Sequence, residues 1–203
     1  MMRRVLLAGV LGGIAMFVWS SIAHIALPLG RTGIKEIPNE QAVLSGMQAQ
    51  LGGTSGLYAF PGMGLGPNPT REEENAAMQQ YEQKLAANPS GILIYHPPGA
   101  KALQPSQLIT ELLTELGEAL LLAWLLAHTS LATLAARMGF VTIAALMAAI
   151  TTNIPYWNWY GFPTSYTTAY MSIQFVGYLL AGLVAAAILK TKATASRTLA
   201  VAA

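Results

Sequence analysis

Three glutamates in one short stretch are the residues whose types and spacing best suit chemistry. Glu111, Glu115 and Glu118 lie in the first half of TELLTELGEALLLAWLLAH, which covers residues 110–128. At about 100° per residue along a helix, the three side chains fall within an arc of about 60°. Carboxylates this close repel one another, so the pattern predicts that the pKa of at least one is raised or that a cation lies among them.

The depth of these carboxylates matters because a charge near the centre of a bilayer costs more than one at its edge. The Arg-Met-Gly sequence at 137–139 is typical of a turn. A membrane-spanning helix of about 20 residues that ends at this turn begins near residue 117. This register predicts Glu111 outside the membrane, Glu115 at its interface and Glu118 about one turn inside.

Polar side chains from the other apolar segments are expected at the same height as the glutamates. Tyr166, Tyr170, Gln174 and Tyr178 are spaced by four residues and therefore form a polar stripe on one helix. We predict an outward-open polar pocket in the outer leaflet that binds a ligand or an ion. Its predicted residues are Glu111, Glu115, Glu118, His24, Asn153, Tyr156, Tyr170 and Gln174.

Two other interpretations of the glutamates stay open. The first is an acidic face that is solvated, or paired with Arg31, Lys35 or Lys101. The second is a metal site formed by His24, Glu115 and Glu118, since imidazole and carboxylate ligands suit zinc, iron or manganese. The sequence lacks a Glu-x-x-His pair, so a divalent metal stays an alternative, and no cofactor is predicted.

The composition indicates a membrane protein. Of the 203 residues, 54% are apolar and only 10% are charged, against about 25% charged in an ordinary soluble domain. Cysteine and aspartate are absent, which excludes disulfides, thiolate metal sites and a Ser-His-Asp triad. The formal charge of +2 and the absence of a dense basic run argue against nucleic acid as a partner, whereas membrane lipid is an expected one.

Four apolar stretches are each long enough to cross about 30 Å of hydrocarbon. They cover residues 5–29, 112–136, 140–160 and 166–189. The predicted fold class is therefore a membrane all-α protein, a four-transmembrane-helix bundle with a small extracytoplasmic α+β insertion between helices 1 and 2. The predicted parts are helix 1 in residues 1–29, the insertion in 30–106, helices 2–4 in 107–190 and a cytoplasmic tail in 191–203. Helix 1 also resembles a signal peptide, and we expect it to be retained as an anchor.

Local signals define the elements of the insertion. Residues 38–53 predict a helix that ends on paired glycines, and residues 56–60 and 91–97 predict strands. Thr70 with Glu73 fits a capping box at the start of a helix that runs to Ala87. A unit of this size buries only a small core, so it is expected to lean on the membrane helices or on a partner.

Basic residues near the helix ends predict the orientation. Arg3 and Arg4, Arg137, and Lys190, Lys192 and Arg197 fall on one side when four helices cross. Because cytoplasmic loops carry the excess of Lys and Arg, both termini are expected in the cytoplasm. The sequence has no glycosylation sequon and few loops, so a bacterial inner membrane is the expected location.

Small residues recur at helical spacing and predict close helix packing. The pairs are Gly9 and Gly13, Ala144 and Ala148, Ala145 and Ala149, and Gly177 and Ala181. Such packing, with few candidate catalytic groups, favours a non-catalytic integral membrane component: a subunit, an assembly factor or a ligand-sensing binder. Its partners would be other membrane subunits or a second copy of the chain. The alternative is a metal- or proton-handling carrier, or an intramembrane enzyme, that uses His24 and the Glu115/Glu118 face.

Overall fold

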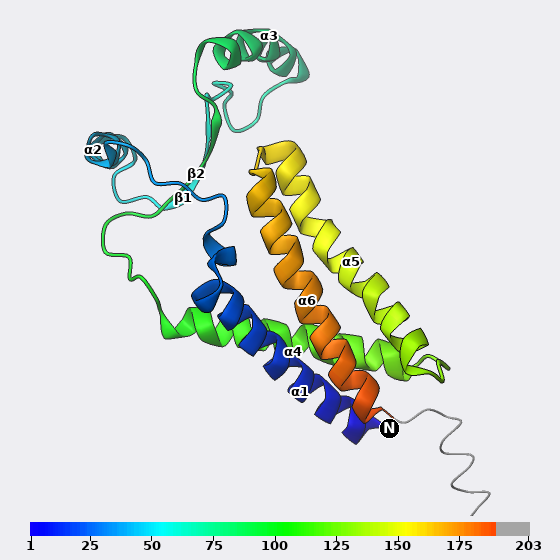
Figure 1. The fold of residues 1–203 in the computed structure, drawn as a ribbon. Coiled ribbons are helices and arrows are strands. Elements are labelled where there is room, and N and C mark those ends of the chain that lie inside the picture. Colours follow the sequence, from blue (N-terminus) through cyan, green and yellow to red (C-terminus); the bar gives the residue numbers. More distant parts are fainter. Residues whose placement is uncertain (190–203) are drawn as a thin grey trace, which may run out of the picture. The chain divides into compact units, whose positions relative to one another are not determined.

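The structure of the protein is a computed structural model that describes residues 1–189 (Figure 1). The chain divides into two compact units. Residues 35–102 form one unit, and residues 1–34 with the chain from Leu103 onward form the other. The predicted cytoplasmic tail and the basic residues Lys190, Lys192 and Arg197 lie outside the described residues.

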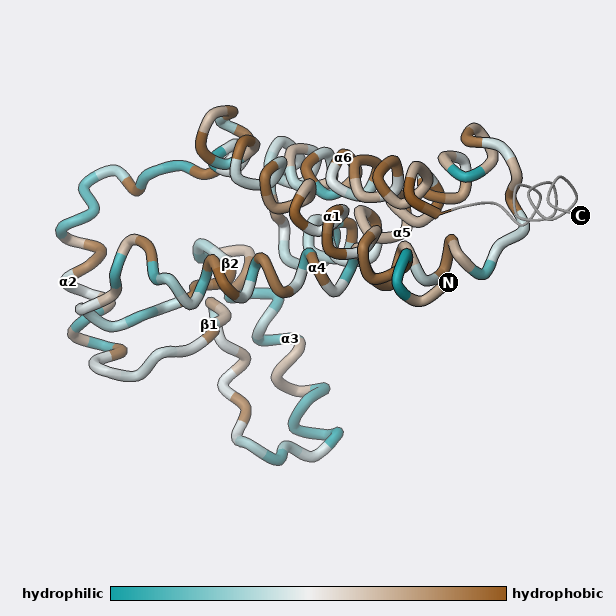
Figure 2. The backbone as a smooth tube through the Cα atoms, turned by 90° about the horizontal axis from the view of Figure 1, so that it is seen from below, coloured by the Kyte–Doolittle hydropathy of each residue, from teal (hydrophilic) through white to brown (hydrophobic). Residues whose placement is uncertain are grey.

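The larger unit contains four long helices. They are α1 (Met2–Ser21), α4 (Pro105–Ala127), α5 (Leu134–Tyr160) and α6 (Thr164–Ile188). A π-helical turn (Ile22–Ala26) extends α1, and a 3-10 turn (Pro28–Arg31) follows it. Three helices are long and apolar enough to cross a membrane: Met2–Ala26, α5 and α6. Hydrophobic residues predominate along them in Figure 2, so the chain has the character of an integral membrane protein.

The fourth helix, α4, has the length to cross a bilayer but not the composition of the other three. Its 23 residues rise about 34 Å. Glu111, Glu115 and Glu118 lie within its last 18 residues and lower their mean hydropathy. In Figure 1, α4 is inclined to α1, α5 and α6.

Small residues bring the helices into close contact, as predicted. A Cβ atom added at Gly13 of α1 would lie 2.6 Å from the Cα of Leu116 in α4. One added at Gly12 would lie 3.4 Å from the Cβ atoms of both Ala119 in α4 and Ala181 in α6. Trp19 of α1 adds a hydrogen bond from its Nε1 to the carbonyl oxygen of Ile173 in α6, at 2.9 Å. Helix α1 is therefore held tightly against both α4 and α6.

The predicted limits of the second apolar helix, 112–136, are wrong. Helix α4 begins at Pro105, because proline suits the first helical position and the Gln107 side chain accepts a hydrogen bond from the Gln104 N–H at 2.8 Å. It ends at Ala127. After a short connection, the Thr133 hydroxyl caps α5 by accepting from the Ala136 N–H at 3.1 Å. Residues 137–139, expected to form the turn, therefore lie inside α5.

Arg137 consequently points into the helical unit and not into a loop. Its side chain is only 7% exposed. The guanidinium donates hydrogen bonds to the carbonyl oxygens of Leu131 at 3.2 Å, Ala186 at 2.8 Å and Leu189 at 2.6 Å. These last two carbonyls lie at the C-terminal end of α6, where a positive charge is favourable. Arg137 thus joins α5 to the end of α6.

The smaller unit has the predicted helix-strand-helix-strand order. Its elements are α2 (Glu40–Leu51), β1 (Gly56–Phe60), α3 (Arg71–Ala87) and β2 (Gly91–Tyr95). The strands pair antiparallel, with Gly56 opposite Tyr95. Neither α2 nor α3 has a buried residue, and the one buried residue of the strands is Tyr95. The core of this unit is therefore as small as expected.

The capping box of α3 is confirmed. The Thr70 N–H donates to the Glu73 carboxylate at 2.7 Å, and the Thr70 hydroxyl accepts from the Glu73 N–H at 3.3 Å. The hydrogen bonds from the Thr70 backbone and then its side chain hold the pKa of Glu73 below its usual range. This local pattern fixes the start of the helix without help from tertiary packing.

Candidate functional site

Glu115 points into the larger unit, toward α1. Its side chain is only 7% exposed, and the hydroxyl of Ser20 in α1 lies beside its carboxyl group. Within residues 1–189, the Glu115 Oε2 atom has no hydrogen-bond partner. A buried polar atom without a partner costs free energy, so it is a position where a proton, a water or a ligand can bind.

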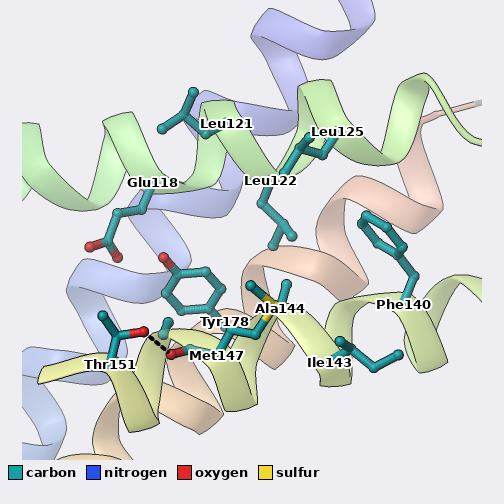
Figure 3. A pocket seen from close by; sticks show the side chains of 11 residues that line it. Glu118, Leu121, Leu122, Leu125, Phe140, Ile143, Ala144, Met147, Thr151 and Tyr178 are labelled. Carbon is teal, nitrogen blue, oxygen red and sulfur yellow. Dashed lines mark hydrogen bonds between the residues drawn. The ribbon is translucent and has the colours of Figure 1, made fainter. Parts of the chain in front are cut away.

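Glu118 points toward a different neighbour, Tyr178 of α6. The carboxylate of Glu118 and the hydroxyl of Tyr178 face each other in Figure 3. They lie at the edge of a pocket between α4 and α5, with a volume of about 380 Å³. The residues that line it are Glu118, Leu121, Leu122, Leu125, Phe140, Ile143, Ala144, Met147, Ala148, Thr151 and Tyr178. This volume falls within the range of small-molecule sites.

The pocket is polar at one end and apolar along the rest of its length. Glu118, Tyr178 and Thr151 gather at one end, whereas Phe140 and Leu125 lie at the other (Figure 3). The Thr151 hydroxyl donates to the carbonyl oxygen of Met147 at 2.6 Å, so its oxygen is left as an acceptor. A site with this gradient suits an amphiphilic molecule.

The side of the pocket is formed by exposed apolar residues. Leu121 of α4 and Ile143 and Met147 of α5 are more than 60% exposed. The pocket lies between α4 and α5, and Tyr178 is the residue that α6 adds to its lining. The pocket therefore opens to the surface between α4 and α5, and apolar side chains surround the opening.

The position of the glutamates along their helix differs from the predicted register, which was counted back from residue 136. Because α4 ends at Ala127, Glu118 lies nine residues, or about 14 Å, from that end. Glu115 lies about 18 Å from it. The two carboxylates therefore flank the midpoint of the helix.

His24 and Tyr170 lie side by side in an aromatic cluster that does not line the pocket. Their rings are 5.8 Å apart in an edge-to-face arrangement. Tyr166 stacks on Tyr170 at 4.3 Å, and Phe162 links Tyr166 to Tyr156 through contacts of 5.2 and 5.5 Å. The His24 Nδ1 atom lies 2.9 Å from the carbonyl oxygen of Ser20, one helical turn away. This cluster joins the end of α1 to the α5–α6 turn.

Asn153 and Gln174 also come together and form a bridge between α5 and α6. The Asn153 Nδ2 atom donates to the Gln174 Oε1 atom at 2.6 Å. Glu111, by contrast, is exposed. The predicted site residues thus occupy separate places, and only Glu118 among them lines the pocket between α4 and α5.

The arrangement gives the metal-site alternative no support. In the part of the chain that the structure describes, no three His, Cys, Asp or Glu side chains gather in a way that could hold a metal ion. His24 contacts Tyr170, Glu115 faces Ser20 and Glu118 faces Tyr178.

Sequence reasoning did not include Ser20, Thr151 or Tyr178 among the site residues. Tyr178 belongs to the polar stripe of α6, so the four-residue spacing already indicated that it shares a face with Tyr170 and Gln174. Ser20 and Thr151 had no comparable signal, because Ser and Thr commonly bond to the backbone of their own helix.

Comparisons with known proteins give one short match. A family model described as the Periviscerokinin family matches residues 53–61, which include β1. No curated protein and no solved structure matches the chain. A match of nine residues does not assign the chain to a family.

Proposed function

We propose that this protein is a non-catalytic integral membrane component that binds a small amphiphilic molecule in the pocket between α4 and α5. The observation that carries the proposal is the pocket of about 380 Å³, apolar along most of its length, with Glu118 and Tyr178 at one end. An ionisable group in the interior of a membrane helix bundle is costly and is retained mostly for function. The opening between α4 and α5 gives a ligand direct access from the lipid.

The proposal is tested by photolabelling. An alkyl chain that carries a diazirine, presented to the purified protein in nanodiscs, should label peptides of α4 and α5 that line the pocket. Labelling should saturate and be displaced by unlabelled decanol. Ala144→Phe, which fills the pocket, should abolish the saturable part, whereas Ala132→Phe, in the exposed connection after α4, should not. Labelling that never saturates, or that is unaffected by Ala144→Phe, contradicts the proposal.

The membrane topology that fits this function has four crossings, with α4 as the second. In this topology, residues 35–102 are extracytoplasmic, both termini are cytoplasmic and the membrane is a bacterial inner membrane. Arg3 and Arg4 before α1 support this orientation. The short connection between α4 and α5 supports antiparallel neighbours.

Cysteine accessibility tests the topology, since the chain has no cysteine of its own. Ser45→Cys, on the exposed surface of α2, is expected to react with a membrane-impermeant maleimide in intact cells. Ser130→Cys, in the connection after α4, is expected to react only after permeabilisation. Equal reaction of both residues in intact cells would mean that α4 does not cross.

A further inference from the structure

Among the residues that the structure describes, the carboxyl group of Glu118 has no cationic side chain beside it. The groups that act on its carboxylate are the Tyr178 hydroxyl and the Glu111 carboxylate, and neither carries a positive charge. Arg137, the basic residue of α5, is bound to the carbonyl oxygens of Leu131, Ala186 and Leu189. A carboxylate in an apolar setting is strongly stabilised by a cation that also donates hydrogen bonds.

The other polar atoms at this end of the pocket also favour a donor. The Thr151 oxygen is an acceptor, because its hydrogen is already donated to the Met147 carbonyl. The Tyr178 hydroxyl faces Glu118 and so uses part of the hydrogen-bonding capacity of its carboxyl group. A head group that enters here therefore meets two acceptors, Glu118 and Thr151, and a carboxylate or phosphate head would be repelled.

The apolar part of the pocket limits the length and polarity of the ligand's tail. From Glu118 to Leu125 the α4 wall rises about 10 Å, and from Phe140 to Thr151 the α5 wall rises about 16 Å. Leucine, isoleucine, methionine and phenylalanine side chains cover these walls. One short alkyl or isoprenoid chain matches this length and lining.

We infer that the pocket selects a single-chain amphiphile with a protonated primary or secondary amine as its head group. The ammonium would bind between Glu118 and Thr151, with the chain lying toward Phe140 and Leu125. A quaternary ammonium has the charge but no hydrogen to donate, so it should bind less well. This inference rests on the proposed function, because it names the ligand class of the same pocket.

Four diazirine probes of equal chain length test it, with amine, alcohol, carboxylate and trimethylammonium heads. We expect the amine probe to saturate labelling of the pocket peptides at a concentration at least about tenfold below that of the alcohol, because a hydrogen bond between two charged groups is stronger than one from a neutral hydroxyl. The trimethylammonium probe should saturate labelling at a concentration between those of the amine and the alcohol. The carboxylate probe should need the highest concentration of the four. Glu118→Gln should remove the advantage of the amine.

Glu82→Gln is the matched control, because it removes the same charge from an exposed position of α3, a helix that contributes no residue to the pocket. It should leave the order of the probes unchanged. Equal labelling by amine and alcohol in the natural sequence overturns the inference but leaves the proposed function intact, since the pocket is still occupied. Failure of all four probes to give saturable labelling overturns both. The probe series on the unmodified protein decides the matter even if Glu118→Gln does not fold.

Discussion

Replacing Arg137 by methionine is expected to destabilise the helical unit by about 3 kcal/mol, the scale of hydrogen bonds made by a buried charged group. Methionine fills similar space but leaves the carbonyl oxygens of Leu131, Ala186 and Leu189 without their donor. It also removes the positive charge from the C-terminal end of α6. Thermal unfolding of the purified protein in detergent measures the effect.

Two further variants give this prediction its controls. Arg137→Lys keeps the charge but lacks the planar fork that reaches several carbonyls, so it should unfold at an intermediate temperature. Arg4→Met removes an arginine from an exposed position of α1 and should unfold as the natural sequence does. If Arg137→Met and Arg4→Met unfold at the same temperature, Arg137 does not join α5 to α6.

The position of Arg137 also explains an error in the sequence analysis. An arginine next to Met-Gly, between two apolar stretches, has the composition of a cytoplasmic turn. Local composition cannot reveal the hydrogen-bond partners of Arg137. They are carbonyl groups at the end of α6, about 50 residues further along the chain. The cluster His128-Thr129-Ser130, followed by Thr133 as a cap, was the better local signal for the turn.

The elements of residues 35–102 were predictable because their signals are local. The capping box of Thr70 and Glu73 fixes the start of α3, and the paired glycines after Leu51 end α2. Both depend on residues within one helical turn. The packing of α1 was predictable for a related reason, since Gly9 and Gly13 leave a surface on which another helix fits closely.

The site itself was only partly predictable. Glu115 and Glu118 share a narrow arc of one helix, which predicted a common pocket. In the structure they face different helices: Glu115 lies against Ser20 of α1, and Glu118 lies against Tyr178 of α6. The cause is that α4 contacts both α1 and α6. Residue spacing on one helix does not determine how its neighbours cross it.

The position of α4 determines whether its glutamates face the interior at all, so it is the claim on which the site depends. A Cβ atom at Gly12 of α1 would lie 3.4 Å from the Cβ of Ala119 in α4. Disulfides have Cβ atoms about 3.5–4.5 Å apart, so a cysteine pair at these two positions should cross-link with little movement. Leu113, exposed and about 9 Å earlier along α4, provides the control position.

Oxidative cross-linking of Gly12→Cys with Ala119→Cys in native membranes is therefore the decisive measurement. A protease site inserted between Gly66 and Pro67 separates α1 from α4 in the chain, so that only a disulfide can hold the two fragments together. We predict that the fragments migrate as one species until reductant is added, and that the pair Gly12→Cys with Leu113→Cys gives separate fragments throughout. Separate fragments from the first pair under the same oxidising conditions would contradict the packing of α4 against α1 and, with it, the inward direction of Glu115 and Glu118.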